Sequence, residues 1–181
     1  MAKNWKNHYI DNAVHHITGT VHQWQTVLLY PPIVNIIMDE LFKKVKRWDA
    51  DIWGYVIMPE HFHLMIQSES GENVRKFLHG FRRYTSSRVK VIIENNDLEF
   101  DDYCKINNVL PNLFYGRTGV KSVFGFWKEK PRVFPITKEN EIQRKLDYIH
   151  NIPVRRGLVK SPGEGEIRVS GMMQDIGLRM S

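Results

Sequence analysis

The alternation of apolar and polar residues predicts two strands separated by a helix in the first third of the chain. Residues 15–22 are rich in threonine and β-branched side chains, which favours a strand. Pro31 and Pro32 then provide a helix start, because proline is tolerated in the first turn. The following apolar residues recur every three to four positions, as on one face of a helix: Ile33, Ile37, Leu41, Val45 and Trp48. Residues 53–66 are apolar and aromatic around one short break, which predicts two consecutive strands.

The middle of the chain predicts a second helix and then an irregular insertion. The helix has an apolar face made of Val74, Phe77, Leu78, Phe81, Val89 and Ile92. Its other face is basic, with Arg75, Lys76, Arg82, Arg83 and Arg88. Residues 94–120 are polar and rich in turn-forming residues, so we interpret them as a loop-rich insertion.

The last third predicts a strand or hairpin over 124–134 and a third helix from about residue 137 to 151. Pro153 disfavours helix at the residue before it and is expected to end the helix. Residues 161–181 show no clear period and are interpreted as a C-terminal tail. The order β-α-β-β-α-β-α predicts one α+β domain over 1–160, a ferredoxin-like antiparallel sheet with helices packed on one face.

Composition narrows the class of protein only slightly. The 181 residues are 42% hydrophobic and 25% charged, and the net charge is +6. A basic balance favours an anionic partner, nucleic acid first, although many soluble proteins are mildly basic. A single cysteine, Cys104, excludes an intramolecular disulfide. No secretion signal and no membrane-length apolar run is present, so we expect a soluble cytoplasmic protein without a membrane partner.

The sequence His61-Phe62-His63 is the first candidate for chemistry. Residues i and i+2 of a strand point to the same face, so the two imidazoles lie side by side and Phe62 points to the opposite face. Two neutral imidazoles at one point can begin a divalent-metal site. The simpler interpretation is a pair of histidines on a half-exposed strand face.

The third helix contributes a second candidate, Tyr148. Ile142, Leu146 and Ile149 define the core stripe of this helix, and Tyr148 lies about 130° away at roughly 100° per residue. Basic residues share its side of the helix. The tyrosine is therefore either a nucleophile directed at a phosphate or a partly exposed residue packed against a loop.

Two segments together, 55–64 (YVIMPEHFHL) and 148–159 (YIHNIPVRRGLV), resemble the HUH single-strand DNA transposases with one catalytic tyrosine. The similarity is greatest to the REP-associated tyrosine transposase branch. Residues 16–20 (HITGT) and 126–128 (FWK) also look like that branch, so the resemblance covers about residues 10–160.

The resemblance implies a function for each matching residue. His61 and His63 match the metal ligands of the family, which uses Mg²⁺ or Mn²⁺. Tyr148 matches the nucleophile, which forms a 5′-phosphotyrosine and releases a 3′-hydroxyl as it nicks and rejoins single-stranded or hairpin DNA. Some relatives act as a homodimer that exchanges tyrosine helices, whereas compact relatives act alone, and the sequence leaves both states open.

Two positions depart from the family pattern. Relatives usually have asparagine four residues after the tyrosine, where it can reach the metal, but this chain has Ile152 there and Asn151 one residue earlier. Either Asn151 is the third ligand, or water fills the site, or activity is weakened. Glu60 stands where asparagine is common, and it either tunes the metal site or is exposed.

Basic and aromatic residues of the second helix and the late segments are candidates for DNA binding. They are Arg82, Arg83, Trp127, Lys128, Lys130, Arg155 and Arg156. The Ile152 departure keeps a second hypothesis open, a non-catalytic protein that binds single-stranded or hairpin DNA. A third, RNA binding by a ferredoxin-like domain, has no supporting aromatic signature in the sequence.

Overall fold

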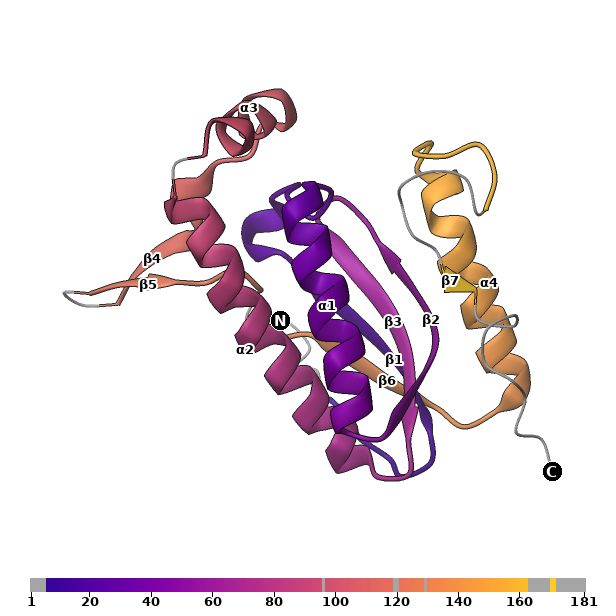
Figure 1. Ribbon diagram of the computed structural model, residues 1–181. Coiled ribbons are helices and arrows are strands. Elements are labelled where there is room, and N and C mark those ends of the chain that lie inside the picture. Colours follow the sequence, from indigo (N-terminus) through magenta and orange to yellow (C-terminus); the bar gives the residue numbers. More distant parts are fainter. Residues whose placement is uncertain (1–5, 96, 119–120, 129, 163–169, 172–181) are drawn as a thin grey trace, which may run out of the picture.

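The fold is built on an antiparallel sheet with the strand order β6-β1-β3-β2-β7. A computed structural model describes residues 6–95, 97–118, 121–128, 130–162 and 170–171. The strands are β1 Val14–Thr20, β2 Ala50–Ile57, β3 His61–Ser68, β6 Arg132–Ile136 and the two-residue β7 Ser170–Gly171 (Figure 1). The predicted ferredoxin-like α+β fold is confirmed.

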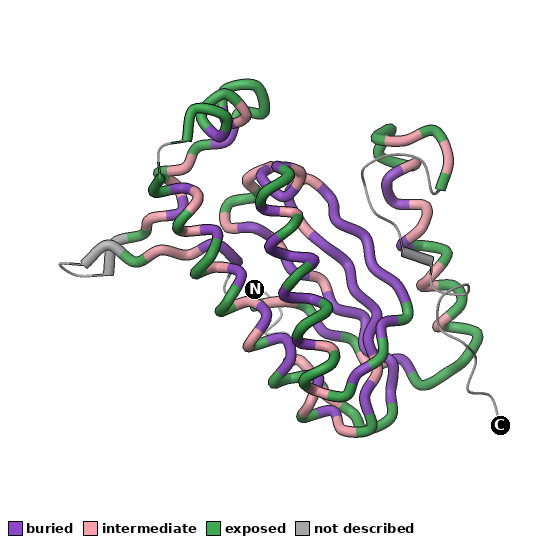
Figure 2. Tube along the Cα trace, viewed as in Figure 1, coloured by how far each residue is buried: buried purple, intermediate pink, exposed green. Residues whose placement is uncertain are grey.

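Two long helices cover one face of the sheet, and their apolar stripes explain why. Helices α1, Pro31–Arg47, and α2, Gly71–Glu94, lie on one face of the sheet (Figures 1 and 2). The buried residues of their predicted apolar faces cluster with Phe62, Leu64 and Ile66 of β3. Phe77 and Phe81 of α2 are completely buried there. Burying each side chain of this size contributes about 1.5–3 kcal/mol, so this layer supplies most of the apolar stabilisation.

The third predicted helix, α4 Glu139–Arg155, packs on the opposite face of the sheet (Figure 1). The prediction of helices on one face thus holds for α1 and α2 but not for α4. A smaller apolar cluster joins α4 to the sheet, formed by Val14, Val56, Met58, Met65, Ile136, Ile149 and Ile152. The sheet therefore separates a large core from a small one.

The C-terminal end of α4 differs from the prediction. The helix continues through Pro153 to Arg155 instead of stopping before the proline. Proline lacks only one backbone donor, and at this position it affects only the last turn. Gly157 ends the helix, since its φ of +67° is a left-handed conformation suited to glycine.

The 94–120 insertion contains regular structure that the sequence did not predict. Helix α3 spans Leu98–Asn107, a 3₁₀ turn spans Pro111–Phe114, and β4, Tyr115–Thr118, pairs with β5, Lys121–Phe124. These elements lie at the far end of α2 from the sheet (Figure 1). Of the predicted tail 161–181, only residues 161–162 and β7 are among the described residues.

The absence of a side chain at Gly19 leaves room for the aromatic ring of Phe62 on the neighbouring strand. Gly19 of β1 lies opposite Phe62 of β3. A Cβ atom at Gly19 would come within 2.2 Å of the Phe62 ring, so no larger residue fits without movement.

In the described part of the chain, no helix is long and apolar enough to cross a membrane.

Candidate functional site

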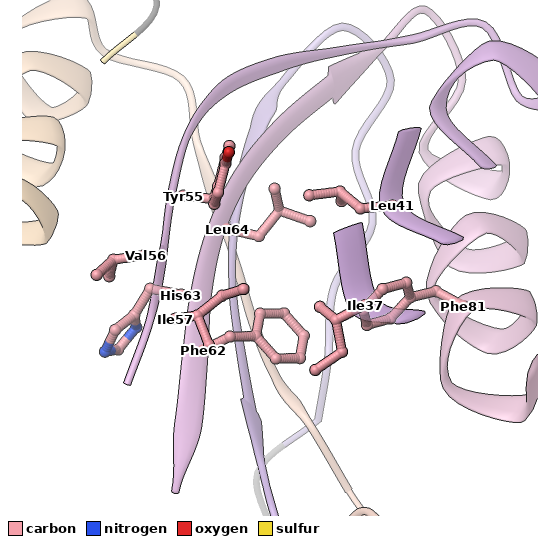
Figure 3. A pocket seen from close by; sticks show the side chains of 9 residues that line it. All are labelled: Ile37, Leu41, Tyr55, Val56, Ile57, Phe62, His63, Leu64 and Phe81. Atoms are coloured by element: carbon pink, nitrogen blue, oxygen red, sulfur yellow. The ribbon is translucent and has the colours of Figure 1, made fainter. Parts of the chain in front are cut away.

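Strand alternation places the two histidines of β3 on the face that α4 covers. His61 and His63 point toward α4, and their ring centroids are 5.0 Å apart. Phe62 points the other way and packs edge-on against Phe81 and Trp127 in the large core. Figure 3 shows Phe62 and His63 on opposite sides of the sheet. The cavity drawn there has a volume of about 10 Å³, enough for at most one water, so it is not a substrate site.

Tyr148 of α4 lies beside these histidines within the same chain. Its ring meets the ring of His63 edge-on, with centroids 6.0 Å apart, and its side chain is 39% exposed. The structure therefore brings together the three residues that the sequence singled out for chemistry. Tyr148 is therefore partly open to solvent.

Two residues of β1 hold His63, and the sequence analysis did not select either of them. His63 Nδ1 lies 3.1 Å from His16 Nε2 and 3.0 Å from Thr18 Oγ1. The His16 ring also stacks on the His63 ring, with centroids 5.1 Å apart. The antiparallel register, which pairs Thr18 with His63, produces these contacts. The sequence signals for them were the i, i+2 spacing within the predicted first strand and the resemblance of residues 16–20 to the transposase branch.

Glu60 holds the other histidine and connects it to α4. Its Oε1 lies 3.2 Å from His61 Nδ1 and accepts a 2.7 Å hydrogen bond from Arg156 Nη1 at the end of α4. Glu60 is only 5% exposed, so of the two interpretations left open the exposed one is wrong. A buried carboxylate with two partners fixes the orientation of the imidazole.

Burial keeps the three clustered imidazoles neutral. Burial, together with the positive charges that His16, His61 and Lys145 can carry, lowers the pKa of His63 to about 3. Burial also lowers the pKa of His16 to about 4, and that of His61 falls below its usual value for the same reason. Neutral imidazole is the form that ligates metals.

The Nε2 atoms of the two histidines of β3 are the nitrogens that could hold a divalent cation. In both rings Nδ1 faces a hydrogen-bonding partner, which leaves Nε2 as the remaining nitrogen. Such partners fix the tautomer and orientation of metal-ligating histidines in known sites. Among the described residues, no group of three or more His, Cys, Asp or Glu side chains is arranged to hold a metal. A cation here would therefore have two protein ligands from these residue types and complete its shell with water.

The predicted third ligand, Asn151, is engaged with its own helix. Its amide nitrogen donates a 2.7 Å hydrogen bond to the backbone carbonyl of Asp147. Within the described residues, no hydrogen bond joins Asn151 to His61 or His63. Ile152, at the position where the family resemblance predicts asparagine, is buried in the small apolar cluster. The assignment of Asn151 stays a prediction.

Cations surround the phenol ring. Lys145 Nζ lies 4.9 Å from the centre of the Tyr148 ring, and the Arg155 guanidinium lies 5.9 Å from it. Both come from α4, one turn before and two turns after the tyrosine. Positive charges at this distance can pair with the phosphates of a bound strand. Lys145 was not among the predicted DNA-binding residues.

The other predicted DNA-binding residues do not form one surface. Arg83 is exposed on α2, on the opposite side of the sheet from Tyr148. Arg82 is half-buried and donates to the backbone carbonyl of Lys128. Lys128 and Lys130 are exposed. Basic residues that are close in the sequence are therefore not gathered in one basic patch.

Trp127 is a core residue, contrary to its predicted contact with DNA. Its side chain is 6% exposed, and its Nε1 donates to Thr85 Oγ1 at 2.9 Å. The ring contacts Phe62, Phe81 and Phe126. With both faces covered by other side chains, it has no surface on which a base could stack.

Comparison with known proteins supports the fold. The chain matches no family model and no curated protein sequence. It is similar to the structure of a REP-associated tyrosine transposase bound to a REP hairpin, at a TM-score of 0.58 and 16% identity over 91% of this chain and 81% of that one. It also matches a protein of Deinococcus radiodurans described as a candidate transposase, with a TM-score of 0.45 and 13% identity over 82% and 96% of the two chains.

The chain thus has the fold of a tyrosine transposase. More narrowly, it shares the fold of a REP-associated tyrosine transposase, and the resemblance predicted from the paired motifs is confirmed at that level.

Proposed function

We propose that this protein is a metal-dependent tyrosine transposase or nickase that cleaves and rejoins single-stranded or hairpin DNA. The observation that carries the proposal is the position of Tyr148 beside His63 in one chain, 6.0 Å between ring centroids. A phenol, two neutral imidazoles with fixed orientation and two nearby cations are groups that can carry out phosphoryl transfer to tyrosine. The structural neighbour bound to a REP hairpin supports hairpin DNA as the class of substrate.

The chemistry assigned to the chain balances without a nucleotide cofactor. The Tyr148 oxygen attacks a phosphorus atom of the DNA backbone and loses its proton, while the bond from phosphorus to the 3′-oxygen breaks. The departing oxygen takes up a proton as a 3′-hydroxyl, and the 5′-phosphate stays on the tyrosine. Attack by another 3′-hydroxyl reverses these bonds and releases the enzyme, so the ester energy is conserved.

Each neighbouring side chain has a distinct part in this proposal. His61 and His63 would hold Mg²⁺ or Mn²⁺ through Nε2, and Asn151 is the remaining candidate ligand. Such a cation supplies charge stabilisation at the phosphate oxygens when bound. Lys145 and Arg155 hold the phosphate near the phenol, and Glu60 with Arg156 keeps the end of α4 at the histidine.

A covalent adduct with DNA tests the proposal. Hairpin oligonucleotides with randomised single-stranded flanks, labelled at the 3′ end, are incubated with the protein and Mn²⁺. We expect an SDS-stable labelled adduct with the wild type and none with Tyr148→Phe. Tyr84→Phe is the matched control, because Tyr84 is exposed on α2, across the sheet, and its loss should leave the adduct. Absence of adduct with the wild type, or an adduct that persists in Tyr148→Phe, refutes the catalytic proposal.

A second candidate function is non-catalytic binding of single-stranded or hairpin DNA. It is favoured by one observation, the apolar environment of Ile152 where the family resemblance predicts a metal ligand. This candidate predicts that the same pool of hairpins is bound without adduct, and that neither Tyr148→Phe nor EDTA changes the affinity.

A further inference from the structure

Trp24 is a large exposed aromatic residue next to the candidate active site. Its side chain is 56% exposed, and its ring lies edge-on to the His61 ring with centroids 6.3 Å apart. The sequence analysis did not select it. Tryptophan is usually among the more buried residues, so a ring left open beside the candidate metal histidine needs a reason.

The backbone that carries Trp24 is held in an unusual conformation. Gln23 and Trp24 have φ angles of 49° and 59°, two consecutive non-glycine residues in the left-handed region. Such a conformation costs of the order of 1 kcal/mol or more per residue and persists only where the surroundings enforce it. Backbone bonds from His22 N to Phe126 O, 2.8 Å, and from Trp24 N to Val21 O, 3.1 Å, are part of that enforcement.

The insertion braces the same loop from the other side. Tyr103 of α3 donates from its hydroxyl to Thr26 O at 2.8 Å, and Thr26 Oγ1 donates to Asn107 O at 2.9 Å. Leu110 N donates to Gln25 Oε1. These bonds fix the loop of residues 22–26, so the exposed ring is presented rigidly.

A cation stands over the ring of Trp24. Lys128 is exposed, and its Nζ lies 5.8 Å from the ring centre. Its backbone is hydrogen-bonded on both sides of its Cα, because its nitrogen donates to Thr20 O at 2.8 Å and its carbonyl accepts from Arg82. A flat aromatic face with an adjacent cation is the combination by which proteins bind an unpaired nucleotide, the base by stacking and the phosphate by charge.

We infer that Trp24 and Lys128 form a nucleotide subsite, in which Trp24 stacks an unpaired base next to the phosphate that Tyr148 attacks. The inference rests on the proposed function, because it assigns a contact to the same DNA strand. It makes Trp24 a substrate-positioning residue, and it gives the 94–120 insertion a purpose, to hold the loop of Trp24 in place.

The test uses a single-stranded oligothymidylate of roughly 15 nucleotides that carries one 5-iododeoxyuridine. Affinity is measured by fluorescence anisotropy, and the photocrosslink to the iodinated base is mapped by mass spectrometry. Trp24→Ala should weaken binding about 5- to 150-fold, the range found for stacking of one base, and Trp24→Phe should weaken it less. The crosslink should map to Trp24.

Trp53→Ala is the matched control. Trp53 is also an exposed tryptophan, at 38%, but it bonds to Gln67 at the other end of β3. Its loss should leave the affinity unchanged. Circular dichroism and Mn²⁺ binding by calorimetry should be the same for both alanine variants, because neither residue is assigned to the metal.

The outcomes separate this inference from the proposed function. Equal affinities for Trp24→Ala and Trp53→Ala, or a crosslink that maps away from Trp24, would overturn the subsite alone. A crosslink at Trp24 in a protein that forms no tyrosine adduct would support the subsite and count against catalysis. No binding of the oligonucleotide by the wild type would overturn the subsite, whereas the adduct assay with hairpins decides the proposed function.

Discussion

The buried pair of His16 and His63 should make the stability of the fold depend on pH. Burial lowers the pKa of His16 to about 4 and that of His63 to about 3, whereas histidine in an unfolded chain titrates near 6.5. The unfolded chain therefore takes up protons that the folded chain excludes. Stability is complete above about pH 6.5 and is lost as the pH falls from there toward 4.

The size of the effect follows from these pKa values. Lowering the pH from 7 to 5 should reduce the free energy of unfolding by roughly 2 kcal/mol through His16, and His63 acts in the same direction. A loss of this size is a large fraction of the stability of a small domain.

Urea unfolding at pH 7 and pH 5, in EDTA to remove bound metal, measures the effect. His16→Phe keeps a ring over His63 but cannot take up a proton. Between pH 7 and pH 5 its free energy of unfolding should therefore fall by roughly 2 kcal/mol less than that of the wild type. His79→Phe replaces an exposed histidine of α2, and its pH dependence should stay that of the wild type. Equal pH dependence of the wild type and His16→Phe would refute the idea of a neutral buried pair.

Three further substitutions test the site and its support. Glu60→Gln removes the negative charge that connects Arg156 to His61. It should weaken Mn²⁺ binding about 10- to 100-fold in calorimetry, and an unchanged affinity would exclude this role of Glu60. Gly19→Ala should lower the free energy of unfolding by roughly 1–3 kcal/mol, because the new methyl group overlaps the ring of Phe62, and the cost should shrink when Phe62→Leu is added. Ile152→Asn should cost about 1–3 kcal/mol in the same assay, since it puts an amide into the small apolar cluster, and an unaltered midpoint would show that this position is not held there.

Local periodicity predicted the elements whose own side chains fill a core. The helices α1 and α2 bury apolar residues at helical spacing, and the strands β2 and β3 are nearly continuous runs of buried residues, so their sequences carry the signal. Helix α3 buries only Phe100 and Cys104, and the polar contacts that fix it come from the loop of residues 22–26. Nothing in its own sequence pattern indicates such contacts, so the insertion was interpreted as a loop.

The residues of the candidate site likewise fall into those that the local sequence predicted and those that it did not. His61 and His63 follow from strand alternation, and helical phase separates Tyr148 from the core stripe. The contacts of His16 with His63 depend on the register between β1 and β3, and the bond from Arg156 to Glu60 spans 96 positions. No local pattern contains either fact. The same holds for basic residues, which the sequence places together and the fold distributes over two faces.

The separation of the two cores has a consequence for the local stability of α4. Helix α4 buries only Ile149, Ile152 and Pro153, while the large core on the other side of the sheet holds the strands in register. Amide protons of α4 should exchange with deuterium before those of β1 and β3, because opening the small cluster leaves the large one intact. A substitution in the helix that carries the tyrosine should therefore disturb the small cluster and leave the large core intact.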